Sequence, residues 1–185
     1  MASPGNSSLG NISPDNIKRI TRISVLAGLA IGIYALETLI PKPLPWLRLG
    51  LSNAVVLCVL TIFGLRDALI VSILRTAIGT LIAGIFLTPF FFFGLLGGIT
   101  STLIMGFFFY YVGNTFSLVG ISILGALSHN TVQLLLAYSL YIKRVEIFYL
   151  VPVFILLAIF TGSLTGMAAI YLRGVLEKNL VTVEC

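Results

Sequence analysis

The stretch ALIVSILRTAIGTLIAGIFL, residues 68–87, is apolar over the length that a helix needs to cross a bilayer, and it carries one cation, Arg75. An arginine near the centre of a membrane-spanning helix costs roughly 2.5–3.5 kcal/mol on insertion scales, so it is kept where it faces protein or a polar cavity. The stretch therefore predicts a transmembrane helix that turns Arg75 toward a pocket inside a helix bundle.

The composition of the whole chain is that of an integral membrane protein. Of 185 residues, 58% are hydrophobic and 9% are charged, and the mean hydropathy is +1.12, which leaves too little polar surface for a soluble domain. The basic groups at 18–22 and 143–144 are short and are typical of membrane flanks, so they indicate lipid phosphates rather than nucleic acid as their neighbours. Cys58 and Cys185 lack metal-ligand spacing, and we predict no metal or cofactor.

Apolar runs separated by short links predict the fold class. Runs of about 17 to 25 residues cross roughly 30 Å of hydrocarbon as helices, and short links force neighbouring helices to be antiparallel. We predict an all-α integral membrane bundle of six transmembrane helices at 20–173, with a flexible tail at 1–19 and a short C-terminal tail at 174–185. The apolar runs are residues 21–40, 47–64, 68–87, 89–112, 116–142 and 147–172.

The distribution of lysine and arginine predicts the orientation. The basic cluster before the first run carries most weight, and it favours a cytoplasmic N-terminus. With six helices, both termini then lie in the cytoplasm, and the protein is a multi-pass component of the cell (inner or plasma) membrane. This orientation places Lys18, Arg19, Arg22, Arg66, Arg173 and Lys178 inside and Lys42, Arg48, Lys143 and Arg144 outside.

The segment ETLIPKPLPWLRLGLSN, residues 37–53, forms a stiff corner between the first two helices. Prolines at alternate positions lack backbone N–H groups and favour extended, polyproline-like geometry. Glu37 lies just within one helix end and Arg48 just within the next, while Asn53 belongs to a small, polar helix start. The corner is either a structural Glu37–Arg48 ion pair or the rim of an outward-facing pocket.

Four polar residues are predicted near the middle of the membrane. His129, Asn130 and Gln133 lie on the fifth predicted helix at about the depth of Arg75 on the third. A single buried histidine is more often a packing residue, and amide side chains often only join helices. Four costly groups at one depth nevertheless favour a shared ligand-binding cavity, open toward the corner at 41–48.

Small residues also recur at helical spacing on the first and last predicted helices. Stripes of this kind let helices approach closely, either inside the bundle or against a partner subunit. The first stripe is Ser24, Gly28, Gly32 and Ala35, and the second is Ala158, Gly162 and Gly166.

Catalytic motifs are absent from the sequence. Asp15 and Asp67 are its only aspartates, so no paired-aspartate cluster can hold Mg²⁺ against a diphosphate, and no P-loop for ATP is present. No nucleophile, base and orienting acid stand together. We therefore predict that the chain is not an enzyme, and uphill transport would need an energy source on another chain.

Three motifs carry a family resemblance. RLGLSN at 48–53, LRTAIGTLIAG at 74–84 and GALSHNTVQ at 125–133 resemble the membrane family named heptaprenyl diphosphate synthase component I, also called Gx transporters, over about residues 23–172. That family is similar to the S components of energy-coupling factor (ECF) transporters. Those are six-helix bundles that capture a small molecule and dock on a transmembrane coupling protein with ATPase subunits.

The resemblance implies a substrate-binding subunit that takes up a small organic solute, such as a vitamin, a flavin or a quinone or isoprenoid precursor. The first small-residue stripe would then be the surface offered to the coupling protein. The alternative is a noncatalytic membrane subunit associated with polyprenyl diphosphate synthesis, since the Asp-rich motifs of the synthases themselves are missing. The predicted solute-binding residues are Glu37, Arg48, Asn53, Arg75, His129, Asn130 and Gln133.

Overall fold

The computed structural model describes residues 14–39, 50–113 and 115–181, and the regular structure in these ranges is helical. The prediction of an all-α fold with six α-helices is confirmed. The corner at 41–48, with Arg48, lies outside the described residues. The α-helices are α1 (Pro14–Leu39), α2 (Asn53–Phe63), α3 (Leu65–Ile82), α4 (Pro89–Tyr111), α5 (Leu118–Ala137) and α6 (Val151–Val181), with a π-helical turn η1 (Tyr138–Ile142) and a 3₁₀ helix η2 (Val145–Leu150) before α6.

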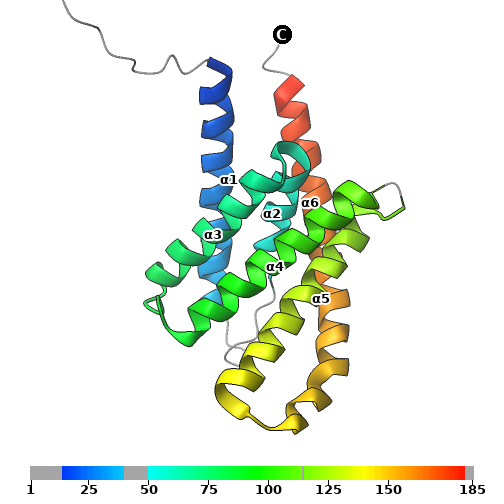
Figure 1. The fold of residues 1–185 in the computed structure, drawn as a ribbon. Coiled ribbons are helices and arrows are strands. Elements are labelled where there is room, and N and C mark those ends of the chain that lie inside the picture. The colour runs from blue at the N-terminus through cyan, green and yellow to red at the C-terminus, as the bar shows by residue number, and fades with distance from the viewer. Residues whose placement is uncertain (1–13, 40–49, 114, 182–185) are drawn as a thin grey trace, which may run out of the picture.

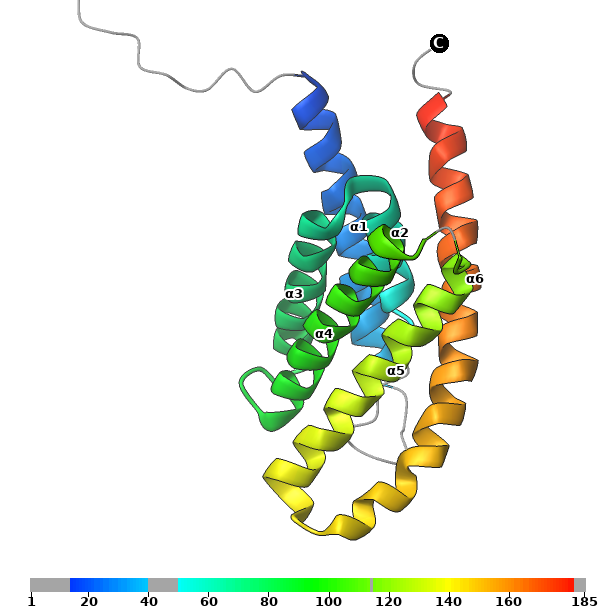
Figure 2. The same cartoon turned by 45° about the vertical axis from the view of Figure 1, so that its right-hand side comes forward.

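Successive α-helices run in opposite directions, so both ends of the described chain lie at the same end of the bundle (Figures 1 and 2). The short helix α2 is at the centre, in contact with α1, α3, α4 and α6, and its residues from Asn53 to Leu60 are buried. Helix α4 packs against α3 on one side and α5 on the other, and α5 pairs with α6. The bundle therefore places the polar start of α2 in its interior.

Four of the helices are long and apolar enough to cross a membrane: residues 16–38, 89–111, 118–140 and 145–178. Helix α2 has 11 residues, which at 1.5 Å per residue is about 16 Å, roughly half of the hydrocarbon thickness. Helix α3 has 18 residues but carries Arg66, Asp67 and Arg75. The six predicted helices are present in the described residues, and four of them qualify as spans by length and composition.

The first and last helices extend beyond their apolar runs. Helix α1 begins at Pro14 and α6 continues to Val181, past the boundaries predicted at 20 and 173. Both extensions are polar. Arg19 donates to Asp67 at the start of α3 at 2.5 Å, and within α6 Arg173 donates to Glu177 at 2.7 Å. The apolar run marks the part of each helix suited to lipid, and not the whole helix.

Local sequence explains several helix boundaries. Gly64 is the single residue between α2 and α3, and its φ of 99° is a left-handed conformation that glycine adopts without steric cost. Pro89 opens α4, where its missing N–H needs no partner, and the hydroxyl of Ser117 caps α5 by accepting the Gly120 N–H at 3.2 Å.

The second small-residue stripe seals the contact between α5 and α6. A Cβ on Gly162 would lie 2.6 Å from the Ile123 Cα, and one on Gly166 would lie 2.7 Å from the Val119 Cα. Ala158 on the same stripe is fully buried. These distances leave no room for larger side chains, so the stripe acts inside the bundle.

Candidate functional site

Arg75 is turned into the bundle and is 2% exposed. Its guanidinium group donates to the hydroxyl of Ser52 and, at 2.5 Å, to the amide oxygen of Asn53. Both partners lie where α2 begins, and both are buried. The start of the central helix thus supplies the polar atoms that a buried guanidinium needs.

Glu37 approaches the same helix start from α1 and is also 2% exposed. Its carboxylate accepts the backbone N–H of Leu51 at 2.5 Å and the hydroxyl of Ser52 at 3.4 Å. The Ser52 oxygen accepts from Arg75 while its hydroxyl donates to Glu37, so one serine connects the two opposite charges. A hydrogen-bonded chain of this kind lowers the cost of keeping both charges away from water.

His129 and Gln133 form a second polar group, on α5. They are one helical turn apart, both are buried, and the side-chain nitrogen of Gln133 lies 3.0 Å from Nε2 of His129. Because an amide nitrogen only donates, the ring nitrogen is the acceptor in this pair. Asn130 is buried as well, but its amide donates to the Phe154 carbonyl of α6 at 3.2 Å. Asn130 therefore joins α5 to α6.

The two polar groups meet helix α4 at neighbouring glycines. A Cβ on Gly97 would lie 2.8 Å from Nδ1 of His129. A Cβ on Gly98 would lie 3.3 Å from Nη2 of Arg75 and 3.0 Å from Oγ of Ser72. Arg75 approaches α4 from α3, and His129 approaches it from α5. The structure therefore brings both side chains to the same level of α4.

Three buried side-chain oxygens at this level have no hydrogen-bond partner among the described residues. They are Oγ of Ser72, Oγ of Ser101 and Oε1 of Gln133. Ser72 lies against Gly98, Gln133 lies beside His129, and Ser101 is one turn beyond Gly97. Nearly all buried polar atoms in native proteins have partners, so three orphans around one turn of α4 indicate a polar site.

Sequence reasoning did not single out Gly97, Gly98 or Ser101. The available signal was the short GGITS segment at 97–101, which interrupts a run of bulky apolar residues. Small residues in such a run are more often packing positions, and only the positions of Arg75 and His129 show what approaches them.

The first small-residue stripe lies on the outer face of α1. Ser24, Gly28 and Gly32 are exposed and Ala35 is half-buried. A Cβ added to Gly28 or Gly32 would meet nothing within 4 Å. Unlike the stripe on α6, this one leaves its surface open in the described chain.

These observations define an integral membrane helical bundle with a buried, charged and polar centre. The sequence matches the family described as heptaprenyl diphosphate synthase component I over residues 26–172, and the chain belongs to this family. The match includes every predicted solute-binding residue from Glu37 to Gln133 and confirms the family resemblance. Comparisons with curated proteins and with solved structures found no match.

Proposed function

We propose that the protein is the solute-binding membrane subunit of an ECF-type transporter and takes up a small organic solute that carries a negative group. Vitamins, flavins and quinone or isoprenoid precursors are the candidate classes. The site would be the region of α4 at Gly97 and Gly98, where the Arg75 and His129 groups meet.

The observation that carries this proposal is the set of orphan oxygens on Ser72, Ser101 and Gln133. A bundle that used its polar residues only to hold its own helices together would pair them with one another. Here the pairing is incomplete beside a buried cation and a histidine, which supports a site completed by a solute.

Each polar residue has a role in this proposal. Arg75 would bind the negative group of the solute, because its planar guanidinium offers a fork of donors that suits a carboxylate or phosphate. Ser52, Asn53 and Glu37 hold that fork in place before the solute arrives. His129 and Gln133 would orient neutral polar groups, and Arg48, outside the described residues, would attract the anion from the corner.

Uptake against a gradient requires partners, since the chain has no P-loop. The open stripe of Ser24, Gly28 and Gly32 supports docking on a transmembrane coupling protein that carries ATPase subunits. The name of the family also implies association with other subunits. We place the end of the bundle that holds both described chain ends in the cytoplasm, because the basic cluster of α1 lies there.

The name of the family supports a second candidate function, a noncatalytic membrane subunit associated with polyprenyl diphosphate synthesis. In that case the chain would hold a synthase at the membrane and would bind no solute. The two candidates differ in one measurable property, which is whether the buried polar site binds a small molecule.

The test is a thermal-shift screen of the purified protein against the candidate solutes, with the Ser101→Ala variant beside the wild type. A solute at a hundredfold excess over its Kd adds about 2.7 kcal/mol of stability, which is readily seen as a raised Tm. Ser101→Ala removes an orphan hydroxyl, so the unliganded variant should be as stable as the wild type or more so, while the shift caused by the solute should shrink.

Ser128→Ala is the matched control, because that hydroxyl bonds the Gly125 carbonyl of its own helix. This variant should keep the full shift. If no candidate solute raises the Tm, and a prenyl diphosphate synthase is recovered with the protein from native membranes, the second candidate function replaces the first.

A further inference from the structure

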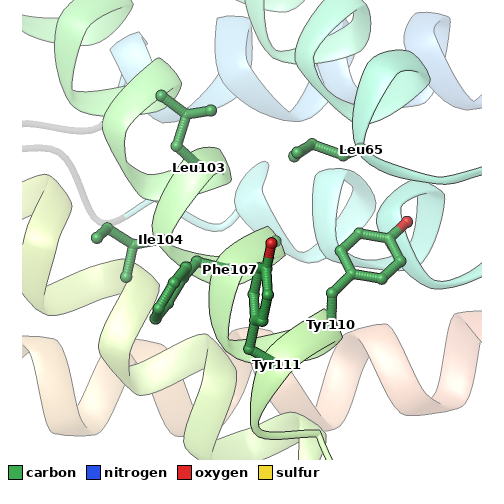
Figure 3. Close-up of a pocket in the computed structure, with 7 residues that line it drawn as sticks. Leu65, Leu103, Ile104, Phe107, Tyr110 and Tyr111 are labelled. Carbon is green, nitrogen blue, oxygen red and sulfur yellow. The ribbon is translucent and has the colours of Figure 1, made fainter.

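A groove lies on the outside of the bundle, between the start of α3 and the last turns of α4, far along α4 from the polar centre. Its cavity has a volume of about 520 Å³, within the usual range for sites that bind small molecules. Figure 3 shows Leu65 and Leu103 on one side of the hollow and Phe107, Tyr110 and Tyr111 on the other. The lining residues are Leu65, Leu103, Ile104, Gly106, Phe107, Tyr110 and Tyr111.

The groove is built into the contact between α3 and α4. A Cβ on Gly106 would lie 2.6 Å from Cδ1 of Leu65, so the glycine leaves the space that this leucine occupies beside α4. The hydroxyl of Tyr110 reaches the corner between α2 and α3, where a Cβ on Gly64 would lie 3.4 Å from it. Close contacts of α4 with α3 and with the turn before it therefore border the groove.

A second hollow continues from the first beyond the end of α4. Its volume is about 390 Å³, it shares Tyr110 and Tyr111 with the groove, and it extends past Val112 and Gly113 to Thr115. Tyrosines are typical of the membrane–water interface, where the ring meets lipid and the hydroxyl meets water. An occupant of both hollows would have an apolar part along α4 and a polar part at its end.

The residue that follows the groove residue Leu65 in the chain is positively charged. Arg66 follows Leu65 in the chain, is exposed, and makes no hydrogen bond or ion pair among those that the structure gives for the described residues. The adjacent acid, Asp67, is matched by Arg19 at 2.5 Å. A polar part placed here is therefore favoured when it is anionic.

We propose that this groove binds one lipid of the surrounding bilayer, with an anionic phosphate headgroup. The acyl chain of the lipid lies between Leu65 and Leu103 and along Phe107. The phosphate of the lipid lies beside Tyr110, Tyr111 and Arg66. Helix α4 is long and apolar enough to span a bilayer, and in a bilayer its exposed face would meet lipid chains, so the proposed occupant would be present at high concentration. The concave shape and the unmatched Arg66 distinguish this lipid from those that contact the rest of the helix.

The test uses the full-length protein in nanodiscs of phosphatidylcholine with increasing amounts of a phosphatidylglycerol that carries a photoreactive diazirine in one acyl chain. Cross-linked residues are mapped by mass spectrometry. Labelling at 103–111 should saturate, and excess unlabelled phosphatidylglycerol should suppress it at least fivefold more effectively than phosphatidylcholine. Labelling that rises in proportion to the probe and is suppressed equally by both lipids means ordinary bilayer contact only, and overturns the proposal.

Two pairs of variants locate the acyl chain and the headgroup of the bound lipid. Leu103→Trp fills the groove and should lower labelling at least fivefold, while Leu96→Trp should not, since Leu96 lies two turns earlier on the same face of α4, is 41% exposed against 46% for Leu103, and does not line the groove. Arg66→Gln should remove the preference for phosphatidylglycerol, whereas Lys18→Gln should keep it; Lys18 is exposed, and its neighbour Arg19 pairs with Asp67 at the start of α3.

Tyr111→Ala provides a second test of the groove if Leu103→Trp yields too little folded protein. Tyr111 is 79% exposed, so its loss should not affect folding but should lower labelling severalfold. Unchanged saturable labelling in Leu103→Trp or Tyr111→Ala would show that the lipid binds elsewhere.

Discussion

Gly97 of α4 and His129 of α5 lie so close that a Cβ on the glycine would sit 2.8 Å from Nδ1 of the ring. The next residue, Gly98, has the same relation to Arg75, at 3.3 Å from Nη2. Two glycines in sequence thus let a cation from α3 and an imidazole from α5 reach one turn of α4. A side chain at Gly97 would meet the His129 ring, and one at Gly98 would meet the Arg75 guanidinium group.

The variant Gly97→Ala tests that relation. The added methyl group must displace the His129 ring, and overpacking of this kind costs typically 1–3 kcal/mol of folding stability. Thermal unfolding of the purified protein should show a lowered Tm, and the shift caused by a bound solute should fall. The control is Gly174→Ala on α6, where nothing lies within 4 Å and alanine should raise stability by up to about 1 kcal/mol. Equal Tm values for the two variants would contradict the close contact.

The link between Glu37 and Arg75 through Ser52 predicts the behaviour of Arg75→Met. Removing the cation takes away the positive charge that faces the buried carboxylate of Glu37 through Ser52, and breaking a buried pair costs roughly 3–5 kcal/mol. The single variant should therefore be less stable and inactive in uptake. The double variant Arg75→Met with Glu37→Gln should regain most of the stability, because neither of these two charges is then buried, and should still fail in uptake.

The four proteins to compare are the wild type, Arg75→Met, Glu37→Gln and the double variant. Thermal unfolding and uptake assays on this double-mutant cycle separate the structural role of Arg75 from its proposed binding role. A double variant that regains both stability and uptake would show that Arg75 serves only the fold. A double variant as unstable as the single one would mean that Glu37 is not the compensating group.

The open stripe on α1 predicts the effect of Gly28→Leu. Nothing lies within 4 Å of a Cβ at this position, so the variant should fold with an unchanged Tm. If the stripe contacts a coupling protein, the leucine side chain will hold α1 and that protein apart. Recovery of the coupling protein and ATPases in affinity purification should then fall severalfold. Gly174→Leu is the matched control, since this glycine also has open space around it but lies on α6. Equal recovery with both variants would exclude the stripe as the docking surface.

The sequence predicted the helical class and the inward direction of Arg75 because both follow from the cost of polar groups in lipid. It did not predict how short α2 is. The apolar run at 47–64 shows where a helix is permitted but not where it begins, and the structure places Gly50 at φ 74° and starts the helix at Asn53. Hydropathy alone does not distinguish a buried central helix from a spanning one.

The sequence also did not predict which helices the polar residues of α5 contact. His129 and Asn130 are adjacent, so they point about 100° apart on a helix, and periodicity does not say which neighbouring helix each one faces. The structure turns His129 toward α4 and joins Asn130 to α6. Glu37 could be matched by charge with Arg48, but its contact with Ser52 depends on how α1 and α2 meet, which no local pattern specifies.

The orientation of the bundle remains a prediction that cysteine accessibility can check. Both described chain ends lie at one end of the bundle, together with the basic cluster of Lys18, Arg19 and Arg22, and lysine and arginine near the membrane favour the cytoplasmic side. In a background with Cys58→Ala and Cys185→Ser, a cysteine at Leu44 should react with a membrane-impermeant maleimide in intact cells. A cysteine at Gly10 should react only after the membrane is permeabilised. Labelling at 10 and not at 44 in intact cells would reverse the orientation, and it would place the groove near the start of α3 at the outer end of the bundle.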